Sequence, residues 1–430
     1  MSATILRRAA LAAGMLGLAT IGCLAGAGSA HATNGYFTIG TDPQTKAMAG
    51  IGVSDDPNGP GAIAANPADG VEAGNLAGGC LDLFVPYRSD TNIGTSGNGH
   101  LQDNDFTSGD HYFAVPCFGM NRRINARTAV GFSLYANGGM DTRYGSNMFS
   151  PGFGAASTPV GVALQQAFFD FNIARSIGHG LTVGVAPVFV FQRMSAYGLQ
   201  PFQNFSEDPT HVTNNGYSYS YGGGLKVGAL WRANSWLNFG ISYQSEMFMT
   251  RFHRYAGLLA DHGSFNVPPT LTEGVTVWPV KSLALSFEHQ IIFYGMIPAL
   301  AHSGALPLTK TAWQLGGAQG AGFGWKNMNV LRVGAQWQAL PALTLRAGFS
   351  HATDFTDNNQ LLFNILAPAT VKDHVTAGLA YALNKNWTVS GAYVHAFAKS
   401  FTGPYIGDPS QTITLRMSQN EFEAGAEYHW

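Results

Sequence analysis

Long segments of this chain alternate apolar and polar residues one by one, and this pattern constrains the fold more than any other feature. In one segment, Leu225, Val227, Ala229 and Trp231 alternate with Lys226, Gly228, Leu230 and Arg232. Residues 237–244 and 343–350 follow the same pattern. A period of two is typical of β-strands whose two faces meet different surroundings. The sequence therefore predicts an all-β protein.

Composition indicates which surroundings those are. Charged residues make up 11% of the chain and hydrophobic residues 46%, and 54 of the 430 residues are glycine. The usual share of charged residues is about 25%. A soluble β-sandwich would also alternate, but here the apolar faces end repeatedly in Trp or Tyr, as interfacial girdles do: Trp231, Tyr243, Trp337, Tyr381 and Trp387. The pattern favours a transmembrane β-barrel, and a net charge of −2 argues against a nucleic-acid partner.

Counting the alternating segments predicts fourteen antiparallel strands. Short turns at 176–179, 233–235, 339–341 and 384–386 alternate with longer loops, the arrangement of outer-membrane barrels. The predicted strands are 75–89, 110–121, 126–138, 165–176, 180–192, 216–232, 235–250, 270–279, 281–296, 325–338, 341–352, 372–383, 386–398 and 414–430.

The two ends of the chain predict export to the bacterial outer membrane. Arg7 and Arg8 precede an apolar run at 9–24 and an A-x-A cleavage motif at 30–32, so residues 1–32 are predicted to be a signal peptide. A membrane anchor and a lipoprotein site at Cys23 are the alternatives. At the other end, residues 421–430 alternate strictly and stop on Trp430, which resembles the signal read by the outer-membrane assembly machinery.

Residues 33–74 do not alternate and are rich in glycine and proline. Such a segment cannot bury enough apolar surface to fold by itself. Ahead of a barrel it is best explained as a plug in the lumen. The predicted organisation is thus a signal peptide (1–32), an N-terminal hatch (33–74) and a transmembrane barrel (75–430).

The hatch sequence also resembles a known family. Asn34-Gly35-Tyr36-Phe37, the stretch 46–52 and Asn66-Pro67-Ala68 are similar to the N-terminal hatch of FadL/TodX-type outer-membrane transporters. The resemblance implies passive uptake of long-chain fatty acids or aromatic and aliphatic hydrocarbons, without a cofactor. It also implies a tight lumenal site capped by Asn34, Gly35, Tyr36 and Phe37.

Two long loops carry candidate ligand-binding residues: Phe202, Phe205, Phe252, Leu258 and Leu259. In the family, the corresponding loops form an outer groove for the hydrophobic ligand, and exposed apolar clusters usually mark binding surfaces. The alternative is that these side chains pack within loops that fold against each other.

The third predicted strand ends with Asn137 and Gly138, and Gly139 follows directly. Paired glycines weaken strand pairing and tolerate the backbone of a bulge. The stretch 136–144 resembles the family's inward kink, which implies a lateral opening through which a ligand leaves into the membrane. The alternative is that Gly138 and Gly139 begin an external loop.

Four cations are expected to face the lumen: Lys226, Arg232, Arg332 and Arg346. They are candidates to bind a carboxylate head group. The alternative is that they pair with acids of the hatch or wall, such as Asp55, Asp56 or Glu288.

Cysteine positions predict one covalent link. If the first hairpin turns near residue 99, Cys80 and Cys117 face each other, and an oxidising periplasm favours a disulfide between them. Two buried free thiols are the alternative.

Catalytic and metal-binding motifs are not apparent in the sequence. Its 13 histidines are scattered, and neither G-x-S-x-G nor a zinc spacing occurs. We therefore predict a non-enzymatic transporter without metal. Its expected partners are a hydrophobic substrate, the bilayer, lipopolysaccharide and, during biogenesis, the assembly machinery, and we expect a monomer. A gated porin for small polar solutes is the alternative function.

Overall fold

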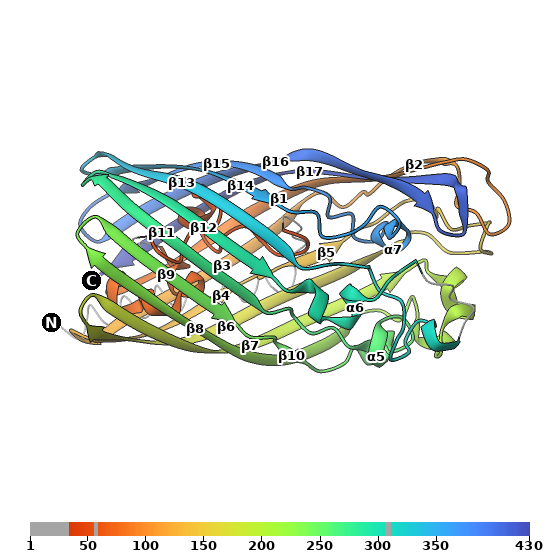
Figure 1. Cartoon of the computed structure of the whole chain (residues 1–430), viewed down its shortest axis with the longest axis horizontal. Coiled ribbons are helices and arrows are strands. Elements are labelled where there is room, and N and C mark those ends of the chain that lie inside the picture. The colour runs from red at the N-terminus through yellow and green to blue at the C-terminus, as the bar shows by residue number, and fades with distance from the viewer. Residues whose placement is uncertain (1–33, 56–58, 306–310) are drawn as a thin grey trace.

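The computed structural model describes residues 34–55, 59–305 and 311–430. The predicted signal peptide lies outside these residues. The described strands form a single antiparallel sheet that closes on itself, because β1 pairs with β17 from Leu76↔His429 to Ile93↔Thr412. The result is a closed barrel, and the C-terminus lies at one end of it (Figure 1).

Fourteen strands make the wall, as the alternation predicts. Three short segments extend longer strands: β2 (Asn104–Thr107) extends β3, β5 (Gly139–Asp141) extends β4, and β10 (Phe248–Met249) extends β9. The long strands are β1 (Leu76–Ile93), β3 (Phe113–Asn125), β4 (Thr128–Tyr135), β6 (Gly161–Gly178), β7 (Leu181–Tyr197), β8 (Ser218–Asn234), β9 (Leu237–Gln244), β11 (Thr270–Val280), β12 (Leu283–Ile292), β13 (Met328–Leu340), β14 (Leu343–Ala352), β15 (Asp373–Ala382), β16 (Trp387–Tyr405) and β17 (Asp408–His429).

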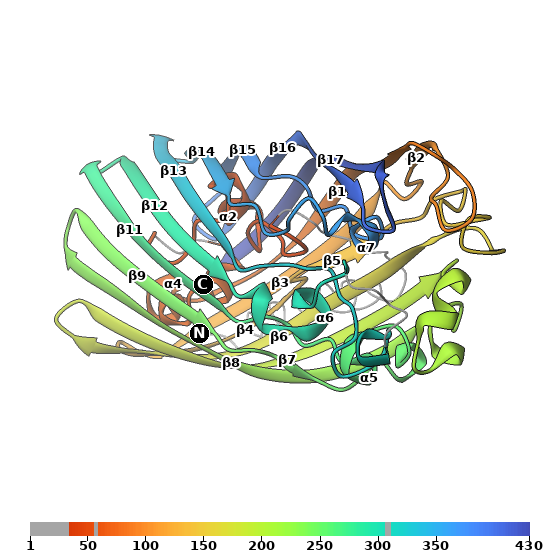
Figure 2. The same cartoon turned by 45° about the vertical axis from the view of Figure 1, so that its right-hand side comes forward.

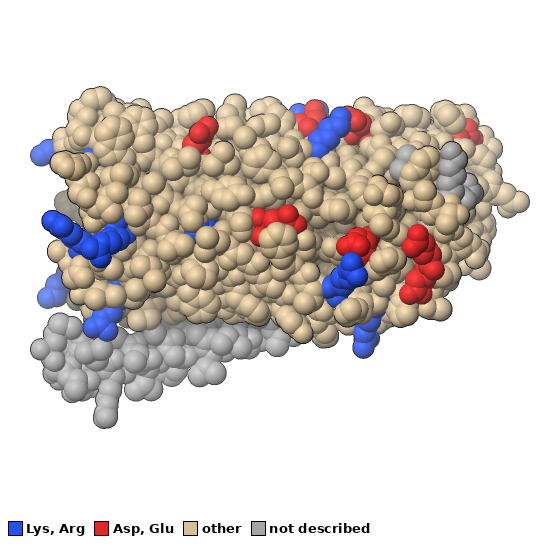
Figure 3. Space-filling model, turned by 60° about the horizontal axis from the view of Figure 1, so that its bottom comes forward, with Lys and Arg blue, Asp and Glu red and all other residues tan. Residues whose placement is uncertain are grey.

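The two faces of the wall follow the sequence pattern. On β8, Leu225, Val227 and Trp231 are exposed, whereas Lys226 and Leu230 between them are buried. The predicted girdle residues are likewise exposed on the outside. Figure 3 shows that charged side chains on this face gather toward the ends of the barrel and leave a band between them with few charges. Such a band suits contact with lipid.

One loop prediction is wrong. Residues 399–413, expected to form a loop, instead extend β16 to Tyr405 and begin β17 at Asp408. The hairpin continues because the upper part of β17 also pairs with β1, as far as Ile93↔Thr412. A strand with neighbours on both sides can extend where its own sequence gives only a weak signal.

The hatch consists of short helices inside the barrel: α2 (Pro43–Ala47), α3 (Ala62–Ala65), η1 (Pro67–Asp69) and α4 (Gly70–Ala73). Helix α2 begins at a capping box in which Asp42 Oδ1 accepts from Thr45 N (2.8 Å), and the chain reverses at Gly50 (φ 90°). Helix α2 packs against β14 to β17, whereas η1 packs against β6 to β8. The hatch therefore spans the lumen from wall to wall (Figure 2).

Glycines of the wall make room for the hatch. A Cβ atom added at Gly240 would lie 1.8 Å from the carbonyl oxygen of Val53, and one at Gly119 would lie 1.8 Å from that of Pro60. These close approaches require the absence of a side chain.

The barrel end opposite the C-terminus carries the long loops (Figure 1). They contain η2 (Gln200–Phe205), η3 (Pro209–His211), η4 (His253–Tyr255), α5 (Ala260–Gly263), η5 (Tyr294–Met296), α6 (Pro298–Ala301), η6 (Thr311–Trp313) and α7 (Leu361–Asn364). None of the helices in the described part of the chain has the length and apolar content needed to cross a bilayer.

Candidate functional site

The wall is interrupted in its third long strand. Strand β4 ends at Tyr135, and β5 resumes at Gly139 on the same neighbour, β6. Three residues, 136–138, stand opposite two on β6, which is the geometry of a bulge. The interruption falls at the predicted Asn137-Gly138-Gly139. Its role as a lateral opening remains a prediction.

A gap in the hydrogen-bond ladder accompanies this interruption. Residues 113–117 of β3 pair with β1, but pairing with β4 begins only at Phe118↔Leu134. In the described part of the chain no ladder joins β5 to β3. Pro116, which has no N–H to donate, lies on this free edge. The wall thus has a break bordered by β3 on one side and β5 on the other.

The first described residues, Asn34–Thr38, cover this break from inside. The N–H of Gly139 donates to the carbonyl of Tyr36 (3.0 Å), and the N–H of Thr38 donates to the carbonyl of Asn137 (3.0 Å). A Cβ atom at Gly138 would lie 2.1 Å from the same Tyr36 oxygen. We call residues 34–38 the tail. Its backbone fits against the break only because residue 138 is glycine.

The tail also contributes the side chain of Tyr36 to an aromatic cluster. The Tyr36 ring is fully buried and lies 5.6 Å from the ring of Tyr294, 6.1 Å from that of Trp325 and 6.0 Å from that of Phe265. Tyr294 donates from its hydroxyl to the carbonyl of Asn34. Burial raises the pKa of the Tyr36 phenol, although a hydrogen bond with Gln166 opposes this, so the ring stays neutral. The cluster is an uncharged, water-poor environment suited to apolar rings.

The loop candidates are not on the surface. Phe202, Phe252, Leu258 and Leu259 are all buried, and Phe205 is partly buried against the same core. These residues therefore do not line an exposed apolar groove but pack within loops that fold against each other, and their role in ligand binding stays a prediction. Their side chains continue the aromatic cluster of the tail, because both belong to one apolar core.

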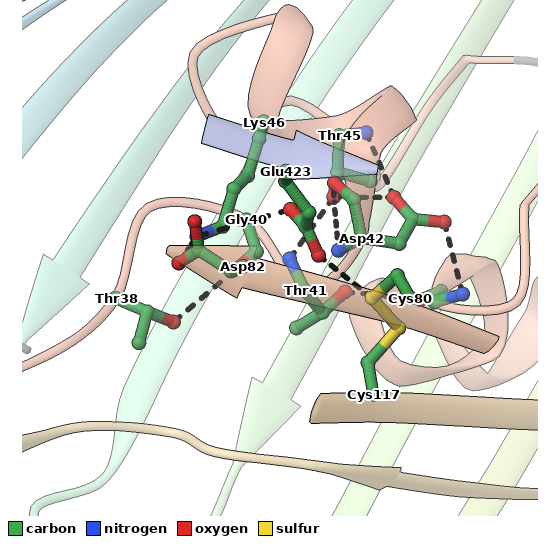
Figure 4. Close-up of a disulfide and its surroundings, with 11 residues drawn as sticks. Thr38, Gly40, Thr41, Asp42, Thr45, Lys46, Cys80, Asp82, Cys117 and Glu423 are labelled. Atoms are coloured by element: carbon green, nitrogen blue, oxygen red, sulfur yellow. Dashed lines mark hydrogen bonds and ion pairs between the residues drawn. A yellow bond between two sulfur atoms is a disulfide. The ribbon is translucent and has the colours of Figure 1, made fainter. Parts of the chain in front are cut away.

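The rest of the hatch is held by polar contacts with the wall. Lys46 Nζ lies 2.5 Å from Asp82 Oδ2 and 3.8 Å from Glu423 Oε2 (Figure 4). It also lies 2.5 Å from Glu421 Oε2. Glu288 accepts from the backbone N–H groups of Gly52 and Val53 at 3.0 and 3.1 Å. These anchors are on different sides of the barrel, so they fix the hatch body more firmly than the tail.

The Asn66-Pro67-Ala68 motif forms another anchor. Asn66 caps η1 by accepting from Ala68 N (3.0 Å), and its amide donates to the carbonyls of Val53 (2.8 Å) and Ala229 (3.2 Å). Pro67 accepts from Asn172 on β6 at 2.9 Å. The motif thus joins the hatch to two parts of the wall, and we assign it a structural role.

The four candidate lumenal cations all have protein partners. Lys226 Nζ lies 2.9 Å from Asp170 Oδ2, and Arg332 Nη1 lies 2.6 Å from Glu288 Oε1. Arg232 lies 3.3 Å from Glu72, and Arg346 donates to Gln44 at 2.6 Å. The alternative of pairing with acids of the hatch or wall therefore describes Lys226, Arg232 and Arg332, whereas Arg346 bonds to the side-chain amides of Gln44 and Gln336.

Cys80 and Cys117 form a disulfide between β1 and β3, with their Cα atoms 4.9 Å apart. They are directly paired in the ladder, one position before β3 meets β4. Among the described residues, the one cluster with three potential metal ligands consists of these two cysteines and Glu423. Sulfur atoms joined in a disulfide are not thiolate ligands.

Two features of this region escaped prediction. Tyr294 and Trp325, which enclose Tyr36, fall inside the predicted strands 281–296 and 325–338, but Tyr294 lies in η5 and Trp325 precedes β13. Glu421 and Glu423 had a signal: both lie on the polar face of the last alternating strand, in a chain poor in charge.

Comparisons agree with this architecture. A family model described as "Outer membrane protein transport protein (OMPP1/FadL/TodX)" matches residues 24–275. The chain resembles the crystal structure of the Pseudomonas putida toluene transporter TodX (TM-score 0.67, 16% identity, 91% of this chain and 99% of that one).

Two further structures show the same likeness. They are a Pseudomonas aeruginosa FadL homologue (TM-score 0.67, 14% identity) and the Ralstonia pickettii toluene transporter TbuX (TM-score 0.57, 20% identity), each aligned over 91% of this chain and 99% of its own. At these identities the likeness concerns the fold. No curated protein sequence matches the chain. The family model spans more than half of the sequence, and the chain belongs to the OMPP1/FadL/TodX family of outer-membrane transport proteins.

Proposed function

We propose that this protein is a passive channel for hydrophobic molecules, in which the tail is the moving part. The ligand is captured among the outer loops, binds at the aromatic cluster of Tyr36, displaces the tail and leaves through the wall break into the membrane. The family and the toluene transporters of similar fold support this class of substrate, and they do not favour a gated porin.

The pairing of the tail with the break carries the proposal. Two backbone hydrogen bonds, Gly139 N to Tyr36 O and Thr38 N to Asn137 O, join the segment that borders the aromatic cluster to the segment that interrupts the wall. Each backbone hydrogen bond contributes a net of only about 0.5–1.5 kcal/mol. A ligand that replaces the buried Tyr36 ring in the aromatic cluster can therefore supply the binding energy needed to displace the tail. The hatch body, held by buried ion pairs, stays in place.

The test is toluene uptake by cells that carry equal surface amounts of wild type, Gly138→Ala or a deletion of residues 34–37. Either change separates the tail from the break. We expect the rate of toluene uptake to rise linearly with toluene concentration instead of saturating. We also expect entry of a small polar solute that the wild type excludes. Gly145→Ala is the control, because nothing lies within 4 Å of a Cβ atom at that loop position.

The proposal is wrong if wild-type cells take up toluene no faster than cells without the protein. It is also wrong if assembled Gly138→Ala behaves like Gly145→Ala, since the tail would then obstruct nothing.

A further inference from the structure

Two cavities lie between the hatch and the wall, and ionisable groups line both. The first has a volume of about 90 Å³ and is bordered by Lys226, Glu288 and Arg332. The second, of about 10 Å³, is at the wall break, where Pro116 of β3 and Tyr135 of β4 line it together with Lys46, Asp82 and Glu423. Figure 4 shows these three charged side chains next to one another. Thr38 of the tail borders both cavities. A molecule that leaves by way of the tail therefore passes these charges.

Each cation at these cavities already has a carboxylate partner. Lys226 pairs with Asp170 at 2.9 Å, and Arg332 pairs with Glu288 at 2.6 Å. All four residues are buried. A second anion at these cavities would compete with the existing carboxylate for each cation, and a buried charge that loses its partner is strongly destabilising.

At the wall break the balance is acidic. One ammonium, that of Lys46, faces three carboxyl groups: Asp82 and Glu421 at 2.5 Å and Glu423 at 3.8 Å. Glu423 lines the opening and is the most distant of the three from Lys46. Positive charge here is already compensated, and an additional carboxylate would be placed among acids.

We infer that the passage selects uncharged hydrophobic molecules and excludes carboxylates, with Asp82 and Glu423 as specificity-determining groups at the break. The inference rests on the proposed function. A carboxylate loses its hydrating water in the passage and gains no uncompensated cation among the residues that line these cavities, so its entry is unfavourable. An uncharged ring pays no such cost and passes from the aromatic cluster to the lipid.

The test compares three probes of similar size: toluene, methyl benzoate and benzoate. Cells without general porins would express the protein, and uptake would be corrected for cells without it. We expect toluene and methyl benzoate to enter at comparable rates and benzoate at least about tenfold more slowly, since 1.4 kcal/mol corresponds to a factor of ten. The ester separates charge from polarity, because it keeps the carboxyl oxygens without the charge.

The outcomes distinguish the inference from the proposed function. If toluene uptake does not depend on the protein, the proposed function fails. If toluene uptake depends on it and benzoate enters equally fast, the function stands and the inference is overturned. If methyl benzoate is excluded together with benzoate, polarity rather than charge is selected, which also overturns the inference.

Variants test the two named residues. In Asp82→Asn/Glu423→Gln, one carboxylate remains for Lys46, and we expect the ratio of benzoate to toluene uptake to rise severalfold. Glu427→Gln is the matched control: it removes an acid from the same face of β17, but Glu427 bonds to Gln44 (2.8 Å) rather than lining the break. An unchanged ratio in the double variant would overturn the assignment. Should that variant fail to assemble, Glu423→Gln keeps both short contacts of Lys46 and serves as the test.

Discussion

At the scale of single residues, Lys46 is the main electrostatic link between hatch and wall. It is buried together with Asp82, Glu421 and Glu423, which come from opposite ends of the barrel sequence. Removing one member of a buried ionic cluster leaves the other charges without compensation. The loss of stability is then larger than the net stabilisation that the intact cluster provided.

We therefore expect Lys46→Met to lower the free energy of unfolding by about 3–5 kcal/mol. The measurement is urea unfolding of the purified barrel, followed by its heat-modifiable migration. Lys385→Met, at an exposed residue in a turn between β15 and β16, is the control and should change little. Equal stability of the two variants would show that the cluster does not hold the hatch.

The wall glycines are a second determinant at this scale. We expect Gly240→Ala to displace the hatch and cost about 1–3 kcal/mol, because the added methyl group would lie 1.8 Å from the Val53 carbonyl. Gly391→Ala, on β16, meets nothing closer than 3.6 Å and should be tolerated. Limited proteolysis of the hatch compares the two. Equal cleavage of the hatch in the two variants would mean that its position does not depend on a glycine at residue 240.

At the scale of elements, the disulfide lies where β3 loses its second neighbour. On one side β3 is joined to β1 by hydrogen bonds and by Cys80–Cys117, and on the other its residues 113–117 are free. The covalent link stabilises the border of the break that the tail does not cover.

We expect Cys80→Ser/Cys117→Ser to lower stability by about 3–4 kcal/mol, the value for a closed loop of this length, 37 residues. The urea midpoint measures this change. Reduction of the wild type should give the same midpoint, and a reductant should not affect the variant. If the oxidised wild type and the variant have the same urea midpoint, the disulfide adds no stability beyond that of the hydrogen-bonded ladder.

At the scale of the whole molecule, closure depends on the last strand, since β17 pairs with both β16 and β1. Its end, Trp430, donates its backbone N–H to the Asn75 carbonyl at 3.3 Å. Its ring stacks on that of Tyr428 on the same strand, with a centroid distance of 6.1 Å, so the terminal aromatic adds little to the pairing that closes the barrel. We predict that it acts instead during assembly.

Trp430→Ala should accordingly reduce the assembled fraction in cells severalfold and leave refolding in detergent micelles unchanged. Phe422→Ala, at an exposed aromatic on the same strand, is the control. A matching loss in cells and in micelles would assign Trp430 to stability rather than to recognition by the assembly machinery.

Much of the barrel could be predicted from the sequence because its signal is local. Alternation such as Leu225-Lys226-Val227 reports which face of a strand meets lipid, and it repeats in every wall strand, so the strand number follows. The paired glycines at 138 and 139 predicted the interruption after β4, because the backbone freedom of glycine is a local property that the sequence shows directly.

Tertiary structure decided what joins distant segments. The partners of Lys46 are 36 and 375 residues away, and they meet it only once the barrel has closed and the hatch has entered. Phe202 and Phe252 looked like an exposed surface because apolar loop residues carry no sign of burial, and only the folding of the loops against each other buries them. The sequence by itself determined a barrel with a hatch, whereas the positions of its charges and aromatic rings depend on long-range register, which no local pattern encodes.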